Sequence, residues 1–256
     1  MYLNKLKIFT LVIISILLMT CFIYLETNLL EVFKYETVLS FLIFFKEFSN
    51  PNISTKFLSE VINASFETIM ISFVSTIISS VFAFFIMIVS NTKNFFLISF
   101  LKLLTNFLRS IPDILWGIIL VIFFGLGPFT GTLALTLHTS GILGRLFVEL
   151  LENQKIQNTL SNFKTNNGSF LRYFFYYIFP KIFPQMISYI LYRWENNIRA
   201  ASILGIIGAG GLGQLLFYRL SLFHYDEVST ILFFTVSMVI LVDLLSSFLR
   251  SKYTGR

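Results

Sequence analysis

Two arginines and a glutamate stand close together in an otherwise apolar part of the chain. Arg193, Glu195 and Arg199 fall within seven residues of one another in the segment 182–207, and Asn196 lies among them. A buried arginine costs about 2.5–3.5 kcal/mol on membrane-insertion scales, so each charge requires a partner or a function. The planar guanidinium group can hold two oxygens of a phosphate-like group at once, which favours binding of an anion.

A structural interpretation competes with anion binding. Glu195 and Arg199 have the i, i+4 spacing of a helical ion pair, with the acid on the N-terminal side, which is the favourable orientation. For Arg199 this ion pair is the preferred interpretation. Arg193 has no partner on its own helix, and for this residue both interpretations stay open.

Two more ionisable side chains fall inside apolar segments. Glu67 has no partner at helical spacing, and we expect it to face Arg193 or Arg199. His138 is expected to hydrogen-bond a neighbouring helix, because a lone histidine there more often does so than binds a metal. The candidate residues of a substrate path are therefore Arg193, Glu195, Asn196, Arg199, Glu67 and His138.

Nothing in the sequence favours catalysis. The chain has no GxSxG nucleophile elbow, no HExxH metal motif and a single cysteine, Cys21. We therefore predict neither catalytic residues nor a metal site.

A string of glycines, GAGGLG, follows the segment that holds the arginines. A nucleotide-binding glycine loop needs a preceding strand, whereas this string follows a membrane helix. Glycine allows the backbone to turn sharply and to pack closely. We expect a hinge or gate at the outer mouth of a helix bundle, formed by Gly208, Gly210, Gly211 and Gly213.

The composition identifies an integral membrane protein. Only 12% of the 256 residues are charged and 56% are hydrophobic, whereas soluble domains carry about 25% charged residues. This excludes a soluble enzyme, a disordered chain and a nucleic-acid binder. A membrane span needs roughly 20 apolar residues. We expect six spans, at residues 8–25, 61–90, 111–127, 129–151, 182–207 and 228–249, with interfacial runs at 38–45 and 95–108.

The basic residues predict the orientation. Twelve of the 19 Lys and Arg fall in segments that face the cytoplasm if the N-terminus is inside, and four fall in outer segments. Both termini are therefore expected to be cytoplasmic. The first span continues past Cys21 without a cleavage pattern, which favours an uncleaved anchor. The expected parts are an anchor helix with an outer segment (1–60), a core transmembrane domain (61–250) with a cytoplasmic segment (152–180), and a tail (251–256).

Several longer motifs resemble one family. Permease subunits of phosphonate ABC importers contain, in the same order, motifs similar to RSIPD (109–113), FGLGPFTG (124–131), LHTSGILGRLFVE (137–149) and YRWENNIRAASILGIIGAGGLG (192–213). RSIP and GAGGLG are shared with related importer permeases such as those for methionine. The run WENNIRAA points to the phosphonate branch.

This resemblance implies an all-α polytopic membrane helix bundle of about six transmembrane helices with the type I ABC importer permease (MetI-like) fold. It implies a second permease chain, expected to be identical, an extracytoplasmic phosphonate-binding protein and an ABC ATPase at the cytoplasmic face of the inner membrane. ATP and Mg would bind the ATPase, and this chain would hold no cofactor. The cargo would be a phosphonate or a related small phosphorus oxyanion.

The same resemblance places the contact with the ATPase in the cytoplasmic segment. Ser161 or Asn162 stands where the family has an acidic residue, and Phe163 is the expected plug for the ATPase groove. Gly168 precedes Pro180 by twelve residues, whereas the family spacing is about thirteen. This segment therefore departs from the family pattern.

Two other functions stay open. The same fold could import an amino acid or a quaternary amine, because Trp194 beside Glu195 is an aromatic and acidic pair that a cation could bind. A membrane enzyme or scaffold that acts without ATP is the third hypothesis.

Overall fold

The computed structural model describes residues 2–24, 34–90, 94–156 and 174–254, which form helices and connecting turns without a strand. The chain divides into two compact units, Met1–Ser49 and Asn50–Arg256. The first helix of the second unit begins at Thr55, and the expected functional boundary after residue 60 stays a prediction.

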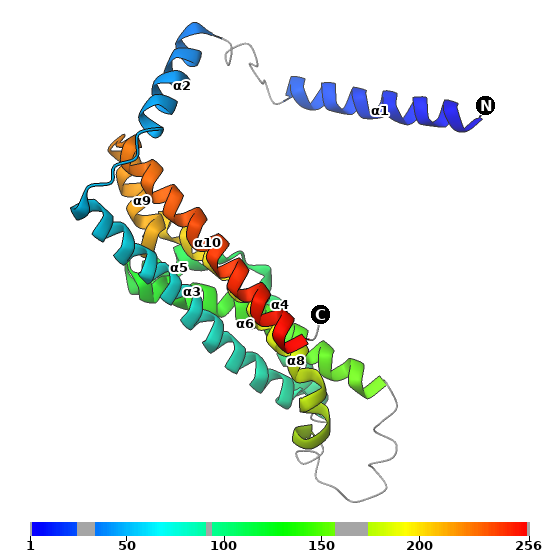
Figure 1. Ribbon diagram of the computed structural model, residues 1–256. Coiled ribbons are helices and arrows are strands. Elements are labelled where there is room, and N and C mark those ends of the chain that lie inside the picture. The colour runs from blue at the N-terminus through cyan, green and yellow to red at the C-terminus, as the bar shows by residue number, and fades with distance from the viewer. Residues whose placement is uncertain (1, 25–33, 91–93, 157–173, 255–256) are drawn as a thin grey trace, which may run out of the picture. The chain divides into compact units, whose positions relative to one another are not determined.

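The first unit contains two helices, α1 (Tyr2–Tyr24) and α2 (Tyr35–Phe48). In the second unit four long helices lie alongside one another in a common direction (Figure 1): α3 (Thr55–Val89), α6 (Pro128–Ile156), α8 (Phe179–Leu204) and α10 (Tyr225–Thr254). The shorter elements are α4 (Phe95–Ser110), α5 (Asp113–Phe124), a π-helical turn η3 (Phe174–Ile178), a 3-10 turn η4 (Gly205–Ile207) and α9 (Gly211–Ser221). The all-α class is confirmed.

Four helices are long and apolar enough to cross a membrane by themselves: Lys7–Tyr24, Thr55–Val89, Pro128–Asn153 and Tyr225–Tyr253. Two bent pairs pass the same test together, namely α4 with α5 and Phe174–Ile207 with α9. The described residues therefore hold four to six candidate spans, and the expected six result if each bent pair crosses once.

The expected third span, 111–127, is not one continuous helix. Helix α5 has 12 residues and is therefore only about 18 Å long, against roughly 30 Å of hydrocarbon. Helix α4 meets it at 91°. The bend falls at Pro112, which lacks a backbone N–H and disfavours helical geometry at Ile111. We call this bend the α4–α5 elbow.

Three apolar clusters hold the second unit together. One lies around Phe147 and Phe174, where α3, α6, η3 and α8 meet. A second joins α3, α8, α9 and α10 around Ile198 and Leu212, and a third joins α3, α5, α6 and α8 around Leu204. Helix α8 contributes to all three clusters, so its polar residues are positioned by the whole unit.

Candidate functional site

Helix α8 carries its polar side chains on two different faces. Successive residues are about 100° apart around a helix, so Arg193 and Asn197 share one face while Glu195 and Arg199 share another. The first face contacts α3 and α6, and the second contacts α10. The charged group predicted from the sequence is therefore two separate sites.

The interior site is built around Asn197, which is completely buried. Its Nδ2 donates to Oγ1 of Thr76 on α3 at 2.9 Å, and its Oδ1 accepts from Oγ1 of Thr139 on α6 at 2.9 Å. Nη2 of Arg193 donates to Thr139 Oγ1 at 3.3 Å and to Asn197 Oδ1 at 3.4 Å. Buried polar groups need such partners, and these bonds connect α3, α6 and α8.

Arg193 forms no ion pair with any carboxylate among the described residues. Its Nε is buried without a hydrogen-bond partner. Asp113, the first residue of α5, attracts this guanidinium group electrostatically without a direct contact. The guanidinium group is therefore held by neutral oxygens of Thr139 and Asn197, and the ion-pair interpretation does not apply to it.

His138 fastens the α4–α5 elbow to α6. Its Nδ1 lies 3.0 Å from the carbonyl oxygen of Ile111. A carbonyl only accepts hydrogen bonds, so Nδ1 carries the proton in this contact. His138 therefore forms a hydrogen bond as expected, but its partner Ile111 lies just after α4 rather than within a neighbouring helix. No group of His, Cys, Asp and Glu among the described residues could hold a metal ion.

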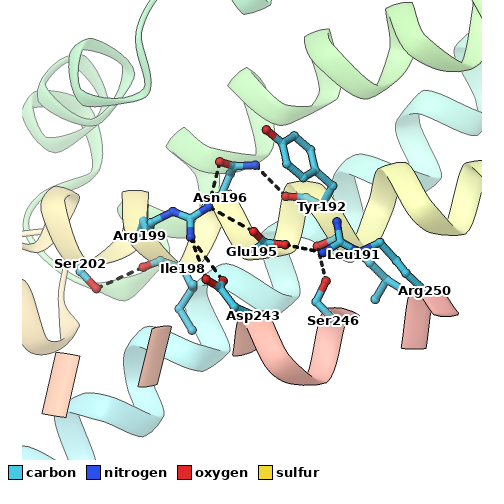
Figure 2. A network of polar contacts seen from close by, with 10 residues as sticks. All are labelled: Leu191, Tyr192, Glu195, Asn196, Ile198, Arg199, Ser202, Asp243, Ser246 and Arg250. Carbon is cyan, nitrogen blue, oxygen red and sulfur yellow. Dashed lines mark hydrogen bonds and ion pairs between the residues drawn. The ribbon is translucent and has the colours of Figure 1, made fainter. Parts of the chain in front are cut away.

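The second site is a chain of alternating charges between α8 and α10 (Figure 2). Glu195 accepts from Arg250 at 3.0 Å and lies 3.6 Å from Arg199. Arg199 Nη1 contacts Asp243 at 3.3 Å, and its Nη2 donates to Asn196 Oδ1 at 3.2 Å. We call Asp243, Arg199, Glu195 and Arg250 the ion-pair chain.

Sequence reasoning found only half of the ion-pair chain. The predicted pair of Glu195 and Arg199 is present, but it is the longest contact of the four residues. Asp243 and Arg250, which come from α10, were not predicted. Asp243 could have been found, because it is the lone carboxylate in the apolar segment 228–249.

The exposed end of the ion-pair chain stands well inside two candidate membrane spans. Arg199 is 40% exposed and Asp243 is 39% exposed on the chain by itself. Arg199 stands near the middle of the bent pair 174–221, and Asp243 near the middle of Tyr225–Tyr253. Charges inside a membrane span generally face the bundle interior or a water-filled cavity rather than lipid.

Arg199 belongs to an exposed line of residues along α8. Tyr192, Asn196, Arg199 and Ile203 follow one another at intervals of three or four residues, and each is at least partly exposed. We call these four residues the α8 stripe. It combines polar and apolar side chains.

The structure places Glu67 against the glycine string. Its Oε1 lies 2.9 Å from the position that a Cβ on Gly210 would take. The expectation that Glu67 faces Arg193 or Arg199 is wrong, because those side chains bond to residues of α6, α8 and α10 instead.

The glycine string packs too closely for side chains. Three glycines of the string have positive φ angles, namely Gly208 (88°), Gly210 (87°) and Gly211 (70°). Residues with a Cβ atom rarely adopt such angles. The backbone N–H of Leu212 donates to Thr68 Oγ1 on α3 at 2.9 Å. A Cβ on Gly213 would collide with the carbonyl oxygen of Ser202. The glycine string is therefore the place where α8, α9 and α3 pack closely against one another.

Most of the predicted ATPase contact lies outside the described residues. This holds for Ser161, Asn162, Phe163 and Gly168. Pro180 is the second residue of α8, where a proline is tolerated because the first turn needs no N–H partner.

Comparison with known families gives the context of these two sites. Residues 83–252, well over half of the chain, match the family described as the inner membrane component of binding-protein-dependent transport systems. The chain belongs to this family. The matched range contains α8 and all four residues of the ion-pair chain of this permease, whereas Thr76 of the interior site lies before it.

Individual relatives agree with the family. The permease is 34% identical over 190 residues to a phosphite transport system permease protein of Stutzerimonas stutzeri, an alignment that covers 73% of this chain and 69% of that protein. It is 32% identical over 121 residues to a protein of Escherichia coli K12 named as a cryptic phosphonate transport system permease, covering 47% of this chain and 98% of the other.

A solved structure has the same fold. An inward-facing structure of a methionine ABC transporter superposes with a TM-score of 0.68 over 78% of this chain and 99% of the other, at 16% identity. The expected type I importer permease fold is confirmed.

Proposed function

We propose that this permease forms part of the membrane path of an ATP-driven ABC importer for phosphite, a phosphonate or a related small phosphorus oxyanion. The observation that carries the proposal is the half-exposed contact of Arg199 with Asp243, 3.3 Å apart near the middle of two candidate spans. Such charges need a water-filled cavity or another protein beside them. The α8 stripe meets that need if it lines the path.

The side chains of the stripe suit an anion. The guanidinium group of Arg199 presents donors that match the oxygens of a tetrahedral oxyanion. The names of the relatives, which refer to phosphite and phosphonate transport, support the same class of cargo.

The same residues argue against a cationic cargo. Glu195 is paired with Arg250, and Asp243 is paired with Arg199. Trp194 is buried and contacts Phe73 edge to face at 5.6 Å, so it offers no open ring to a cation. These contacts favour an oxyanion over an amino acid or a quaternary amine. Membership of a transport family argues against an ATP-independent enzyme or scaffold.

Individual roles follow from the two sites. We assign Arg199 and Asn196 to direct contact with the cargo, because both lie on the α8 stripe. Glu195 anchors Arg199 from α8 itself. Arg193 and His138 have a structural role, because their hydrogen bonds hold α6 against α8 and against the α4–α5 elbow.

The proposed assembly has two identical permease chains, an ABC ATPase and an extracytoplasmic phosphonate- or phosphite-binding protein. ATP and Mg bind the ATPase, and this chain holds no cofactor. Both termini lie in the cytoplasm, so Glu67 and the glycine string Gly208–Gly213 stand at the outer mouth and form its gate. The segment 152–180 meets the ATPase.

Replacing Arg199 by glutamine tests the proposal. We expect ATP-dependent uptake of labelled phosphite to fall by more than about tenfold, because the cargo loses its charged hydrogen bonds at membrane depth. The measurement uses vesicles that contain the permease and its ATPase, supplied with the binding protein. Arg145→Gln is the matched control. Arg145 forms an ion pair with Glu149 at 2.6 Å, and both residues belong to α6 rather than to the α8 stripe.

Undiminished uptake by the Arg199 variant would refute its role in the path. The proposed function itself fails if the wild-type assembly hydrolyses ATP but accumulates neither phosphite nor any phosphonate.

A further inference from the structure

The contact between Arg199 and Asp243 is looser than its two charges would allow. Both carboxylate oxygens of Asp243 approach the same guanidinium nitrogen, Nη1, at 3.3 and 3.4 Å. The strong arrangement for this pair places one oxygen on each of two nitrogens. Nη2 of Arg199 turns instead to Asn196 at 3.2 Å. Asp243 therefore does not use the fork that Arg199 presents.

The other half of the ion-pair chain is tighter and better shielded. Glu195 is 15% exposed and contacts Arg250 at 3.0 Å. Asp243, at 39% exposure, is the more accessible of the two carboxylates in the ion-pair chain. A half-exposed ion pair contributes little stability, so Asp243 can leave Arg199 at a small cost while Glu195 and Arg250 stay together.

The four charges of the ion-pair chain cancel. An oxyanion that arrives at Arg199 therefore finds no net positive charge within the ion-pair chain and must compete with Asp243 for the guanidinium group. Conduction through a path requires binding that is strong enough for entry and weak enough for release. The carboxylate of Asp243 has this effect when it is paired with Arg199. It lowers the affinity for the oxyanion and leaves the guanidinium group in place to recognise it.

We propose that Asp243 is a built-in counter-ion of Arg199, which a small phosphorus oxyanion displaces during passage and which then returns to expel it. This inference rests on the proposed function and adds the carboxylate that limits the affinity of the site. The oxyanion takes the two guanidinium nitrogens, and Asp243 turns toward the open side of the α8 stripe. Glu195 and Arg250 keep α8 and α10 in register meanwhile.

The variant Asp243→Asn tests the inference, because it keeps the shape of the side chain and removes its charge. We expect the purified complex of permease and ATPase, without binding protein, to bind phosphite about tenfold more tightly than the wild type. Affinity is read from the phosphite-dependent rise of the melting temperature. Uptake in vesicles should become several-fold slower, because release is delayed.

Glu149→Gln is the matched control. It removes a carboxylate from an ion pair of similar exposure on α6, with Arg145 at 2.6 Å, and phosphite affinity should stay at the wild-type value. Unchanged or weaker phosphite binding by Asp243→Asn overturns the inference. If the wild type still imports phosphite in that case, the proposed function stands and only the displaced counter-ion is refuted.

A measurement on the wild-type complex avoids any folding defect of the variant. A displaced carboxylate is more accessible to a water-soluble carbodiimide, so phosphite should raise the labelling of Asp243 by about threefold, as measured by mass spectrometry of its peptide. Labelling of Glu149 serves as the internal reference. Labelling of Asp243 that does not respond to phosphite would also overturn the inference.

Discussion

Asn197 is the residue on which the interior site depends. One amide group bonds to α3 through Thr76 and to α6 through Thr139, and it also accepts from Arg193. All of its polar atoms are removed from water. The loss of such a side chain leaves several buried donors and acceptors without partners, which costs more than one hydrogen bond contributes.

We expect Asn197→Ala to destabilise the permease by about 1–3 kcal/mol. The thermal midpoint of the purified complex should fall by several degrees, as measured by loss of its folded form on heating. Asn196→Ala is the control for stability, because among the described residues both of its bonds stay within α8: its Nδ2 donates to the Tyr192 carbonyl oxygen and its Oδ1 accepts from Arg199. Equal midpoints for the two variants would contradict the structural role of Asn197.

At the scale of single residues, the sequence identified the important charged residues more successfully than it identified their bonding partners. Arg193, Glu195 and Arg199 were recognisable because charges in an apolar segment are costly. Their separation onto two faces of α8 follows from helical geometry alone. Arg250 was out of reach, because sequence does not specify the register in which α10 lies against α8.

The junction of α8 and α9 depends on two glycines. Gly205 and Gly213 approach so closely that a Cβ on Gly213 would lie 2.9 Å from Cα of Gly205 and would strike the Ser202 carbonyl. Backbone cannot move aside as the end of a side chain can. Small residues that allow such approach are typical of packed membrane helices.

Gly213→Ala should therefore separate α8 from α9 and reduce both the yield of folded protein and uptake by at least about fivefold. Gly144→Ala on α6 is the matched control, since the added Cβ would meet only side-chain atoms of Thr105 and Ile86 at 3.1 and 3.2 Å. Yield is measured by size-exclusion chromatography of the purified permease. Normal behaviour of the Gly213 variant would show that the junction tolerates displacement.

The α4–α5 elbow is the element for which sequence reasoning was incomplete. An interfacial run at 95–108 was predicted. The bend of 91° was not, because the sequence does not reveal that His138 on α6 bonds the free carbonyl of Ile111. That contact links residues that are 27 positions apart.

For the whole molecule, composition and hydropathy were sufficient to predict a membrane helix bundle. They could not predict which surface faces lipid, because apolar residues cover much of the outside of the second unit. Ile203 on α8 is 49% exposed and Leu241 on α10 is 61% exposed. The ion-pair chain distinguishes these two exposed positions. Ile203 lies on the α8 stripe together with Arg199, whereas Leu241 lies about 200° around α10 from Asp243 and so points away from the ion-pair chain.

The most direct test compares the access of water to these two positions. Single cysteines at Ile203 and Leu241, in a background with Cys21→Ala, are treated with a charged, water-soluble thiol reagent while the assembled importer hydrolyses ATP. If the α8 stripe lines a water-filled path and this face of α10 lies against lipid, Ile203→Cys should react at least about tenfold faster than Leu241→Cys. Equal rates, or faster reaction at Leu241→Cys, would contradict the account.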